Sequence, residues 1–138
     1  MALNIQSVGL IGAGQMGNGI AHVCALAGYS VMLNDVSGDR IKAGMATING
    51  NMTRQVGKKL ISDEDRKAAL ARIKPAEKFD AMSGCDIVIE TAAEKEDVKR
   101  KIFSDLCAAL KPEEEFLQVW HLADADRPEL AEMRALAC

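Results

Sequence analysis

Two segments decide the fold of this chain: Val8-Gly9-Leu10-Ile11-Gly12-Ala13-Gly14-Gln15-Met16-Gly17 and, after an apolar stretch, Val31-Met32-Leu33-Asn34-Asp35. Together they predict a strand, a glycine turn, a helix, a second strand and an acidic residue, in that order. The glycines of the turn fit the pattern G-x-G-x-x-G, which arises easily by chance. The prediction therefore depends on whether the surrounding residues agree with it.

The residues of the first strand suit burial in a sheet, and those of the turn let the backbone approach a ligand and the helix closely. Val8 to Ile11 is a short apolar run with β-branched ends, which is typical of a buried parallel strand. Gly12 permits a tight turn, and Gly14 lets the backbone approach a pyrophosphate because it has no Cβ. Gly17 lets the following helix pack close to the strand.

The first helix is expected from about Gln15 to Ala27, with Gly28 as its left-handed C-cap. Its apolar residues recur on one face, which we expect to be buried: Ile20, Val23, Cys24 and Ala27. The first-turn amides have no helical partner, and the helix dipole adds roughly half a positive charge there. A diphosphate site is therefore predicted over the turn residues Gly12, Ala13, Gly14, Gln15, Met16 and Gly17.

Asp35 ends the second strand, where the dinucleotide fingerprint places an acid. A carboxylate there can accept hydrogen bonds from both ribose hydroxyls and repels a 2′-phosphate. No Arg or Lys follows directly in Val36-Ser37-Gly38, so the sequence predicts NAD rather than NADP. The alternative is a glycine turn beside a surface Asp with no ligand, but strand, turn, helix, C-cap and acid all favour a cofactor site.

The rest of the chain alternates helices and strands. We expect helices over 38–59 (with a face of Ile41, Met45, Ile48, Met52 and Val56), 62–72, 94–110 and 128–137. Strands are expected over 73–74, 86–90 and 116–120, with a loop or one helical turn over 78–84. Ser37 and Ser62 are the expected N-caps. This order predicts an α/β fold, a Rossmann-type doubly wound parallel sheet with helices on both faces.

Length and composition exclude several classes of protein. The 138 residues suit one domain, and 49% hydrophobic with 27% charged residues is typical of a soluble globular protein. A net charge of −3 with interspersed basic residues, and only 4% aromatics, argue against nucleic-acid binding. No apolar run suits a membrane span and no signal peptide is recognised. The four cysteines lack C-x-x-C spacing, so we expect reduced thiols and a cytoplasmic location.

Four segments carry a family resemblance: Ile11 to Ala21, Asn34-Asp35, Thr47 to Asn51, and Val88 to Phe103. They closely resemble the nucleotide-binding domain of the 3-hydroxyacyl-CoA dehydrogenases, and most of all the bacterial 3-hydroxybutyryl-CoA dehydrogenases. The resemblance covers about residues 5 to 115, in the family's order and spacing.

The resemblance implies roles for particular residues. The turn from Gly12 to Gly17 would hold the pyrophosphate of NAD, and Asp35 the adenosine ribose. Glu94 and Lys99 match an acid and a lysine that contact the cofactor, although their spacing alone fits a solvated helix face equally well. Lys59 lies near the position where the family places a basic residue that contacts the CoA of an acyl-CoA substrate. The resemblance also implies a homodimer.

The sequence departs from the family after Leu110. The family continues with an Asn-Thr-Ser-Ser segment, a Gly-x-His-Phe-x-Asn-Pro segment that holds the catalytic His, a Glu partner and a helical domain, and none of these is found here. No catalytic residue is therefore assigned: His121 lacks the family's flanking residues, and His22 is expected to be a partly exposed helix residue. We expect an incomplete NAD-binding domain over 1–115 and a divergent, truncated or frameshifted tail over 116–138.

Two functions follow from this resemblance. In the family, as the resemblance implies, a His takes the proton of the 3-hydroxyl while C3 passes hydride to the nicotinamide. The chain would be the NAD-binding part of such an oxidoreductase, acting in fatty-acid or butanoate metabolism. The alternative is an NAD-binding module without catalysis. A third interpretation, another NAD-dependent hydroxyacid dehydrogenase, is disfavoured by the segment from Glu90 to Lys101.

Overall fold

The computed structural model describes residues 4–91, 96–109 and 118–121 of the chain. Its helices are α1 (Gln15–Leu26), α2 (Gly38–Gly57), α3 (Asp63–Arg72), the 3-10 helix η1 (Phe79–Gly84) and α4 (Glu96–Ala109). Its strands are β1 (Ser7–Ile11), β2 (Ser30–Asn34), β3 (Ile73–Pro75), β4 (Ile87–Glu90) and β5 (Gln118–His121). These elements follow the predicted order, with ends that differ by a few residues.

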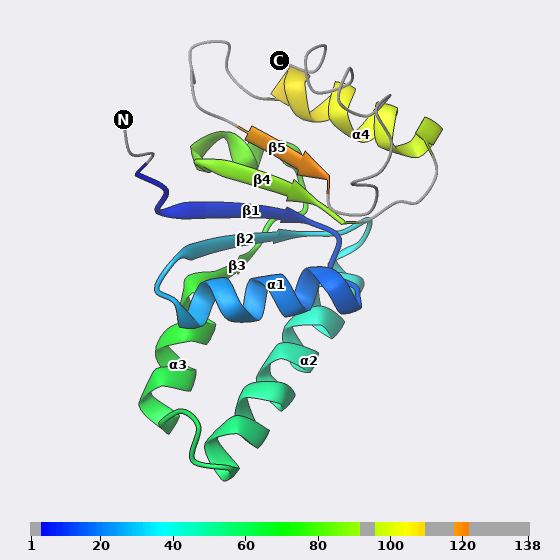
Figure 1. The fold of residues 1–138 in the computed structure, drawn as a ribbon. Coiled ribbons are helices and arrows are strands. Elements are labelled where there is room, and N and C mark those ends of the chain that lie inside the picture. The colour runs from blue at the N-terminus through cyan, green and yellow to red at the C-terminus, as the bar shows by residue number, and fades with distance from the viewer. Residues whose placement is uncertain (1–3, 92–95, 110–117, 122–138) are drawn as a thin grey trace.

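The strands form one parallel sheet in the order β3-β2-β1-β4-β5. In Figure 1, α1, α2 and α3 lie on one side of this sheet and α4 on the other. The chain builds outward from β1 in one direction and then, at β4, in the other. The predicted Rossmann-type fold is confirmed, and the point where the strand order reverses lies between β1 and β4, where such folds bind ligands.

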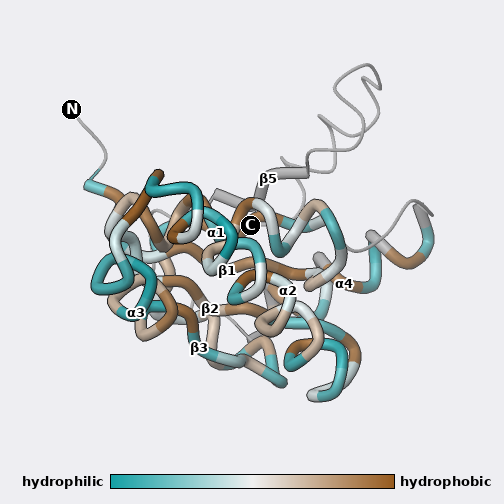
Figure 2. Tube along the Cα trace, turned by 90° about the horizontal axis from the view of Figure 1, so that it is seen from below, coloured by the Kyte–Doolittle hydropathy of each residue, from teal (hydrophilic) through white to brown (hydrophobic). Residues whose placement is uncertain are grey.

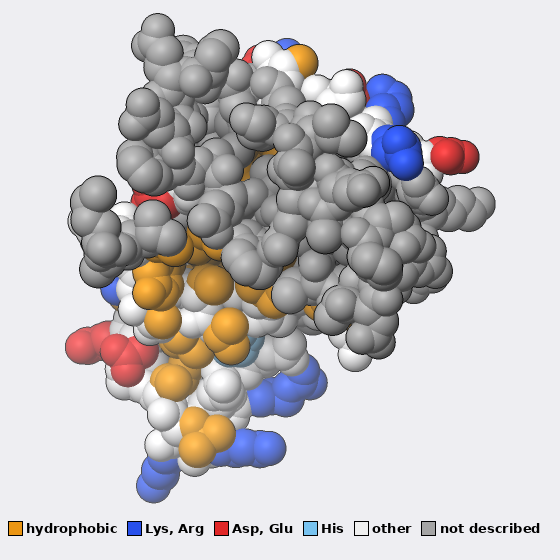
Figure 3. Space-filling model, turned by 45° about the horizontal axis from the view of Figure 1, so that its top comes forward, with side chains coloured by type: hydrophobic (Ala, Val, Ile, Leu, Met, Phe, Trp, Pro, Cys, Tyr) orange, Lys and Arg blue, Asp and Glu red, His pale blue; other side chains and the backbone are white. Residues whose placement is uncertain are grey.

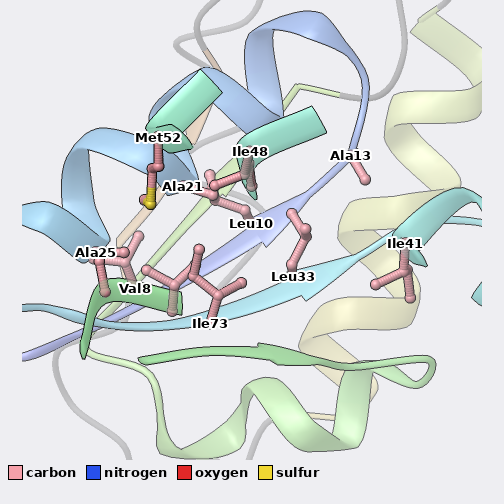
Figure 4. Close-up of a cluster of buried hydrophobic side chains, with 12 residues drawn as sticks. Val8, Leu10, Ala13, Ala21, Ala25, Leu33, Ile41, Ile48, Met52 and Ile73 are labelled. Carbon is pink, nitrogen blue, oxygen red and sulfur yellow. The ribbon is translucent and has the colours of Figure 1, made fainter. Parts of the chain in front are cut away.

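The sheet has a hydrophobic core on each face. One cluster joins β1, β2 and β3 to the inner sides of α1, α2 and α3, and Figure 4 shows Leu10 and Leu33 in it beside Ile48 of α2. The other cluster joins the opposite face to η1 and α4, through residues such as Met82, Val88 and Leu106. Figure 2 accordingly shows hydrophobic residues along β1 and β2 in the middle of the molecule, with hydrophilic turns of α3 outside.

The buried face of α1 matches the predicted one in part. Ile20 and Cys24 are half-buried and pack against the core, whereas Ala27 is exposed and Val23 is 61% exposed. The residues that are buried instead are Gly17, Asn18, Ala21, His22 and Ala25. Gly17 packs directly against the glycine turn, and Ala21 and Ala25 follow it one and two turns further along the same side. Small residues therefore take the most buried positions of α1. The prediction that His22 is partly exposed is therefore wrong.

The other helix predictions are confirmed in their main features. Gly28 follows α1 with a φ of +101°. Ser37 caps α2 by accepting from the N–H of Arg40, and Ser62 forms a reciprocal capping box with Asp65 at the start of α3. The predicted core face of α2 is buried or half-buried throughout. Helices α2 and α3 contact each other and form a hairpin. One end of this hairpin packs against α1 and β3, and the other end extends away from the sheet (Figure 1).

Predictions for the last part of the chain can be compared only in part. The strand expected over 116–120 is present as β5, at Gln118–His121, and pairs in parallel with β4. The expected helix over 128–137 lies outside the described residues. Cys24 is half-buried and Cys85 is buried. Among the described helices, none has the length and apolar character needed to cross a membrane.

Asp86 joins the start of β4 to the start of β1. Its Oδ2 accepts hydrogen bonds from the N–H groups of Gln6 (2.8 Å) and Ser7 (3.0 Å), and these two donors hold the pKa of the Asp86 carboxyl below its ordinary value of 3.8. Replacing Asp86 with alanine should therefore lower the free energy of unfolding by about 1 kcal/mol near neutral pH.

The same bonds predict how this loss depends on pH. Because the pKa is lower in the folded chain, the stabilisation is complete above the ordinary pKa of the unfolded carboxyl and is lost as pH falls through the folded value. Urea unfolding of both proteins between about pH 6 and about pH 2 should show their stabilities converging in acid. A difference that stays constant over this range would contradict the role of the charged carboxylate.

Candidate functional site

The glycine turn between β1 and α1 has a conformation that needs two of its glycines. Gly12 has a φ of +108° and donates its N–H to the carbonyl of Asn34 at 2.8 Å. A Cβ on Gly17 would lie 1.7 Å from the carbonyl oxygen of Gly12 and 2.9 Å from Oγ1 of Thr91. The turn can therefore bring the start of α1 against the end of β1 only with these glycines in place.

The middle of the turn faces open space. A Cβ on Gly14 would meet nothing within 4 Å, and Gly14, Gln15 and Met16 are exposed while Gly12 and Gly17 are buried. Gly14 is the N-cap of α1, so the helix has no side-chain cap, and its first turn holds no acidic residue. In contrast, α2 and α3 each have a serine cap and an acidic first turn. The first-turn N–H groups of α1 therefore remain available as donors at the positive end of the helix dipole. This arrangement fits a diphosphate.

Asp35 lies beside the glycine turn. Its Oδ2 accepts a hydrogen bond from the N–H of Ala13 at 2.9 Å, and its Oδ1 accepts one from the N–H of Val36. The side chain is half-buried, and Val36 after it is 84% exposed. Since a carboxylate has about four acceptor positions, Asp35 can hold the turn and still accept from a ribose.

Thr91 supports the turn from the other side, and its role was not predicted. Its N–H donates to the carbonyl of Ile11 at 2.8 Å, and its hydroxyl donates to the same oxygen at 3.1 Å. These bonds connect the residue after β4 to the last residue of β1, at the carboxyl edge of the sheet. The sequence shows only a polar residue after a strand. The contact can be recognised only once the pairing of β1 with β4 is known.

The remaining predicted cofactor residues lie on or before α4. Glu94 lies outside the described residues. Lys99 lies in the first turn of α4, which Figure 1 shows starting near the carboxyl ends of the strands. The structure therefore places the backbone of Lys99 at the same end of the sheet as the glycine turn.

Lys59 lies far from the glycine turn. It follows α2 at the tip of the hairpin, at the end that Figure 1 shows remote from the sheet. Lys59 is exposed, with a φ of +59°, and Leu60 beside it is 67% exposed. In Figure 3, Lys and Arg side chains surround hydrophobic ones at the lower end of the molecule, where this hairpin lies. The tip thus combines exposed lysines and apolar surface with the acidic first turn of α3.

The two histidines have different surroundings. His22 is buried, and its Nε2 lies 2.8 Å from Oε1 of Gln55, which joins α1 to α2. His121 ends β5, where its backbone is in register with Glu90 of β4. Within the part of the chain that the structure describes, no group of three or more potential ligand residues is arranged to hold a metal ion.

The parallel sheet, the glycine turn with its uncapped helix and the acid after β2 define a dinucleotide-binding Rossmann domain. A family model described as "3-hydroxyacyl-CoA dehydrogenase, NAD binding domain" matches residues 7–117. The chain belongs to this family of NAD-binding domains.

Known proteins agree with this assignment. The chain is 61% identical to a 3-hydroxybutyryl-CoA dehydrogenase of Bradyrhizobium diazoefficiens over 94% of its own length and 46% of the relative's. It is 33% identical to the 3-hydroxyadipyl-CoA dehydrogenase of Escherichia coli, over 82% of this chain and 24% of that one. The crystal structure of an (S)-3-hydroxybutyryl-CoA dehydrogenase from Ralstonia eutropha superposes with a TM-score of 0.81 at 36% identity, covering 86% of this chain and 41% of that one. The chain thus spans less than half the length of these relatives.

Proposed function

We propose that this chain is the cofactor-binding part of an NAD-dependent 3-hydroxyacyl-CoA dehydrogenase of the 3-hydroxybutyryl-CoA type. The 61% identity to a 3-hydroxybutyryl-CoA dehydrogenase supports this most strongly. The open, uncapped turn and the half-buried Asp35 agree with it. The proposal includes a place in fatty-acid or butanoate metabolism in the cytoplasm.

We assign each part of NAD to different residues of the chain. Gly12, Ala13, Gly14, Gln15, Met16 and Gly17 form the turn that receives the pyrophosphate. Asp35 accepts hydrogen bonds from the adenosine ribose and excludes a 2′-phosphate by charge repulsion. Glu94 and Lys99 are proposed to contact the cofactor, as the family resemblance implies. When bound, NAD supplies the acceptor for a hydride, and these residues orient it in the site.

The acid–base part of the reaction is proposed to need residues that this sequence does not contain. No segment matches the family's His motif, so the domain of residues 1–115 positions the cofactor, and 116–138 is a divergent segment. An acyl-CoA substrate and a homodimer, as the family resemblance implies, belong to the whole enzyme. The alternative is an NAD-binding module without catalysis.

NADH oxidation with acetoacetyl-CoA, measured by absorbance while NADH fluorescence reports binding, tests this proposal. We expect NADH binding without turnover by the chain alone, and restored turnover only when the family's His segment and helical domain are fused after residue 115. Turnover by the chain alone would show that it holds a base, and His121 would be the first residue to replace. A folded chain that does not bind NADH would contradict the proposal.

Lys59 is proposed to contact the CoA part of the substrate. It is held in the left-handed conformation at the end of α2, a position that favours glycine. Replacing Lys59 with glycine should therefore raise the free energy of unfolding by about 0.5–1 kcal/mol and weaken acetoacetyl-CoA binding to the fused enzyme.

The neighbouring Lys58 gives a matched control. Its φ is −85°, so replacing it with glycine relieves no backbone strain and should not stabilise the chain. Urea unfolding measures the stability of both variants, and a titration with acetoacetyl-CoA measures binding. A Lys59→Gly protein that is more stable and binds acetoacetyl-CoA unchanged would remove Lys59 from the proposed site.

A further inference from the structure

Gly44, in the second turn of α2, packs directly against the glycine turn. A Cβ at this position would lie 2.8 Å from the carbonyl oxygen of Ala13 and 2.9 Å from the Cβ of Ala13. Neither atom is the end of a flexible side chain that could turn away. A side chain at Gly44 would therefore have to displace either the helix or the backbone of the turn.

Ala13 is also held on another side. Its N–H donates to Oδ2 of Asp35 at 2.9 Å, and the residue is 5% exposed. Ala13 belongs to the same buried cluster as Ile41 and Ile48, which flank Gly44 on the inner face of α2 (Figure 4). The contact with α2 and the bond to Asp35 together fix the position of Ala13.

We propose that Gly44 is a positioning residue for NAD binding, which acts through Ala13 and does not itself touch the cofactor. This proposal rests on the proposed role of the turn in holding the pyrophosphate. With a glycine at this place, α2 approaches closely enough to hold the turn in the shape that leaves Gly14 open. The turn is thus fixed by α2, as well as by the two elements that it connects.

The test compares two substitutions in the same helix, Gly44→Ala and Gly50→Ala. A Cβ on Gly50 meets nothing within 4 Å, and this residue is exposed. Both substitutions bring the same gain in helix propensity, so their difference reports the contact with Ala13. NADH fluorescence titrations should show a dissociation constant about tenfold higher for Gly44→Ala, and one within about twofold of wild type for Gly50→Ala.

The double variant Ala13→Gly/Gly44→Ala distinguishes the contact with Ala13 from a general packing defect. It removes the overlap between the two Cβ atoms, so its NADH affinity should be partly restored relative to Gly44→Ala. A general packing defect would not be relieved in this way. Circular dichroism monitors folding of each variant.

Each outcome decides the proposal. Equal NADH affinity of the folded Gly44→Ala and Gly50→Ala proteins would overturn it while leaving the proposed function intact. Loss of folding in both Gly44→Ala and the double variant would also overturn it, because Gly44 would then serve core packing. A folded wild-type chain that does not bind NADH would overturn both proposals.

Discussion

Gly17→Ala is expected to lower NADH affinity on the order of a hundredfold, the largest effect that we expect from a single substitution in the site. The added Cβ would lie 1.7 Å from the carbonyl oxygen of Gly12 and 2.8 Å from its carbonyl carbon. Both are backbone atoms, so α1 must move away from β1 and the turn must open. The first-turn N–H groups of α1 would then no longer converge on the diphosphate.

The neighbouring Gly19 is the control for this substitution. It lies in the same helix and is exposed, and a Cβ on it would meet nothing within 4 Å, so Gly19→Ala should bind NADH like wild type. Fluorescence titration with NADH measures affinity, and circular dichroism shows whether each variant folds. A folded Gly17→Ala protein with the affinity of Gly19→Ala would contradict the predicted place of the pyrophosphate.

Asp35→Ala is expected to weaken NADH binding by about 10- to 100-fold. Hydrogen bonds to a charged group contribute about 1.5–3 kcal/mol, and the substitution removes the proposed bonds to the ribose. It also removes the acceptor of the Ala13 N–H, so the turn loses one of the bonds that shape it. Titrations with NADH and NADPH measure both affinity and cofactor preference.

Asp35→Asn separates these two contributions. The amide oxygen can still accept from the Ala13 N–H, but the negative charge that repels a 2′-phosphate is gone. We expect a smaller loss of NADH affinity than with alanine and a weaker preference for NADH over NADPH. An unchanged preference in the folded asparagine protein would show that the charge of Asp35 does not select the cofactor.

The fold was predictable because its determinants are local in the sequence. Short apolar runs such as Val8 to Ile11, serine caps such as Ser62, and Gly28 after α1 each act on neighbouring residues. The buried face of α1 is predicted only in part, because Ile20 and Cys24 pack against the core while Val23 and Ala27 are exposed. There the contact of Gly17 with the turn decides which side faces the sheet, and it favours small residues over Val23.

The candidate site was predictable where one segment contains it. The glycine turn and Asp35 were recognised because the fingerprint fixes their spacing in the sequence. The supports at Thr91 and Gly44 were not, since each touches the turn only after distant elements pack together. Helix propensity treats Gly44 as a weak point of α2, whereas the structure gives it a close contact that no other residue allows.

A fluorescence titration of the folded wild-type chain, first with NADH and then with NADPH, decides whether the glycine turn and Asp35 form a working NAD site. We predict saturable binding of NADH, with NADPH binding weaker by about tenfold or more because of the carboxylate. A folded chain that binds neither cofactor, or that binds both equally, would contradict this account of the site.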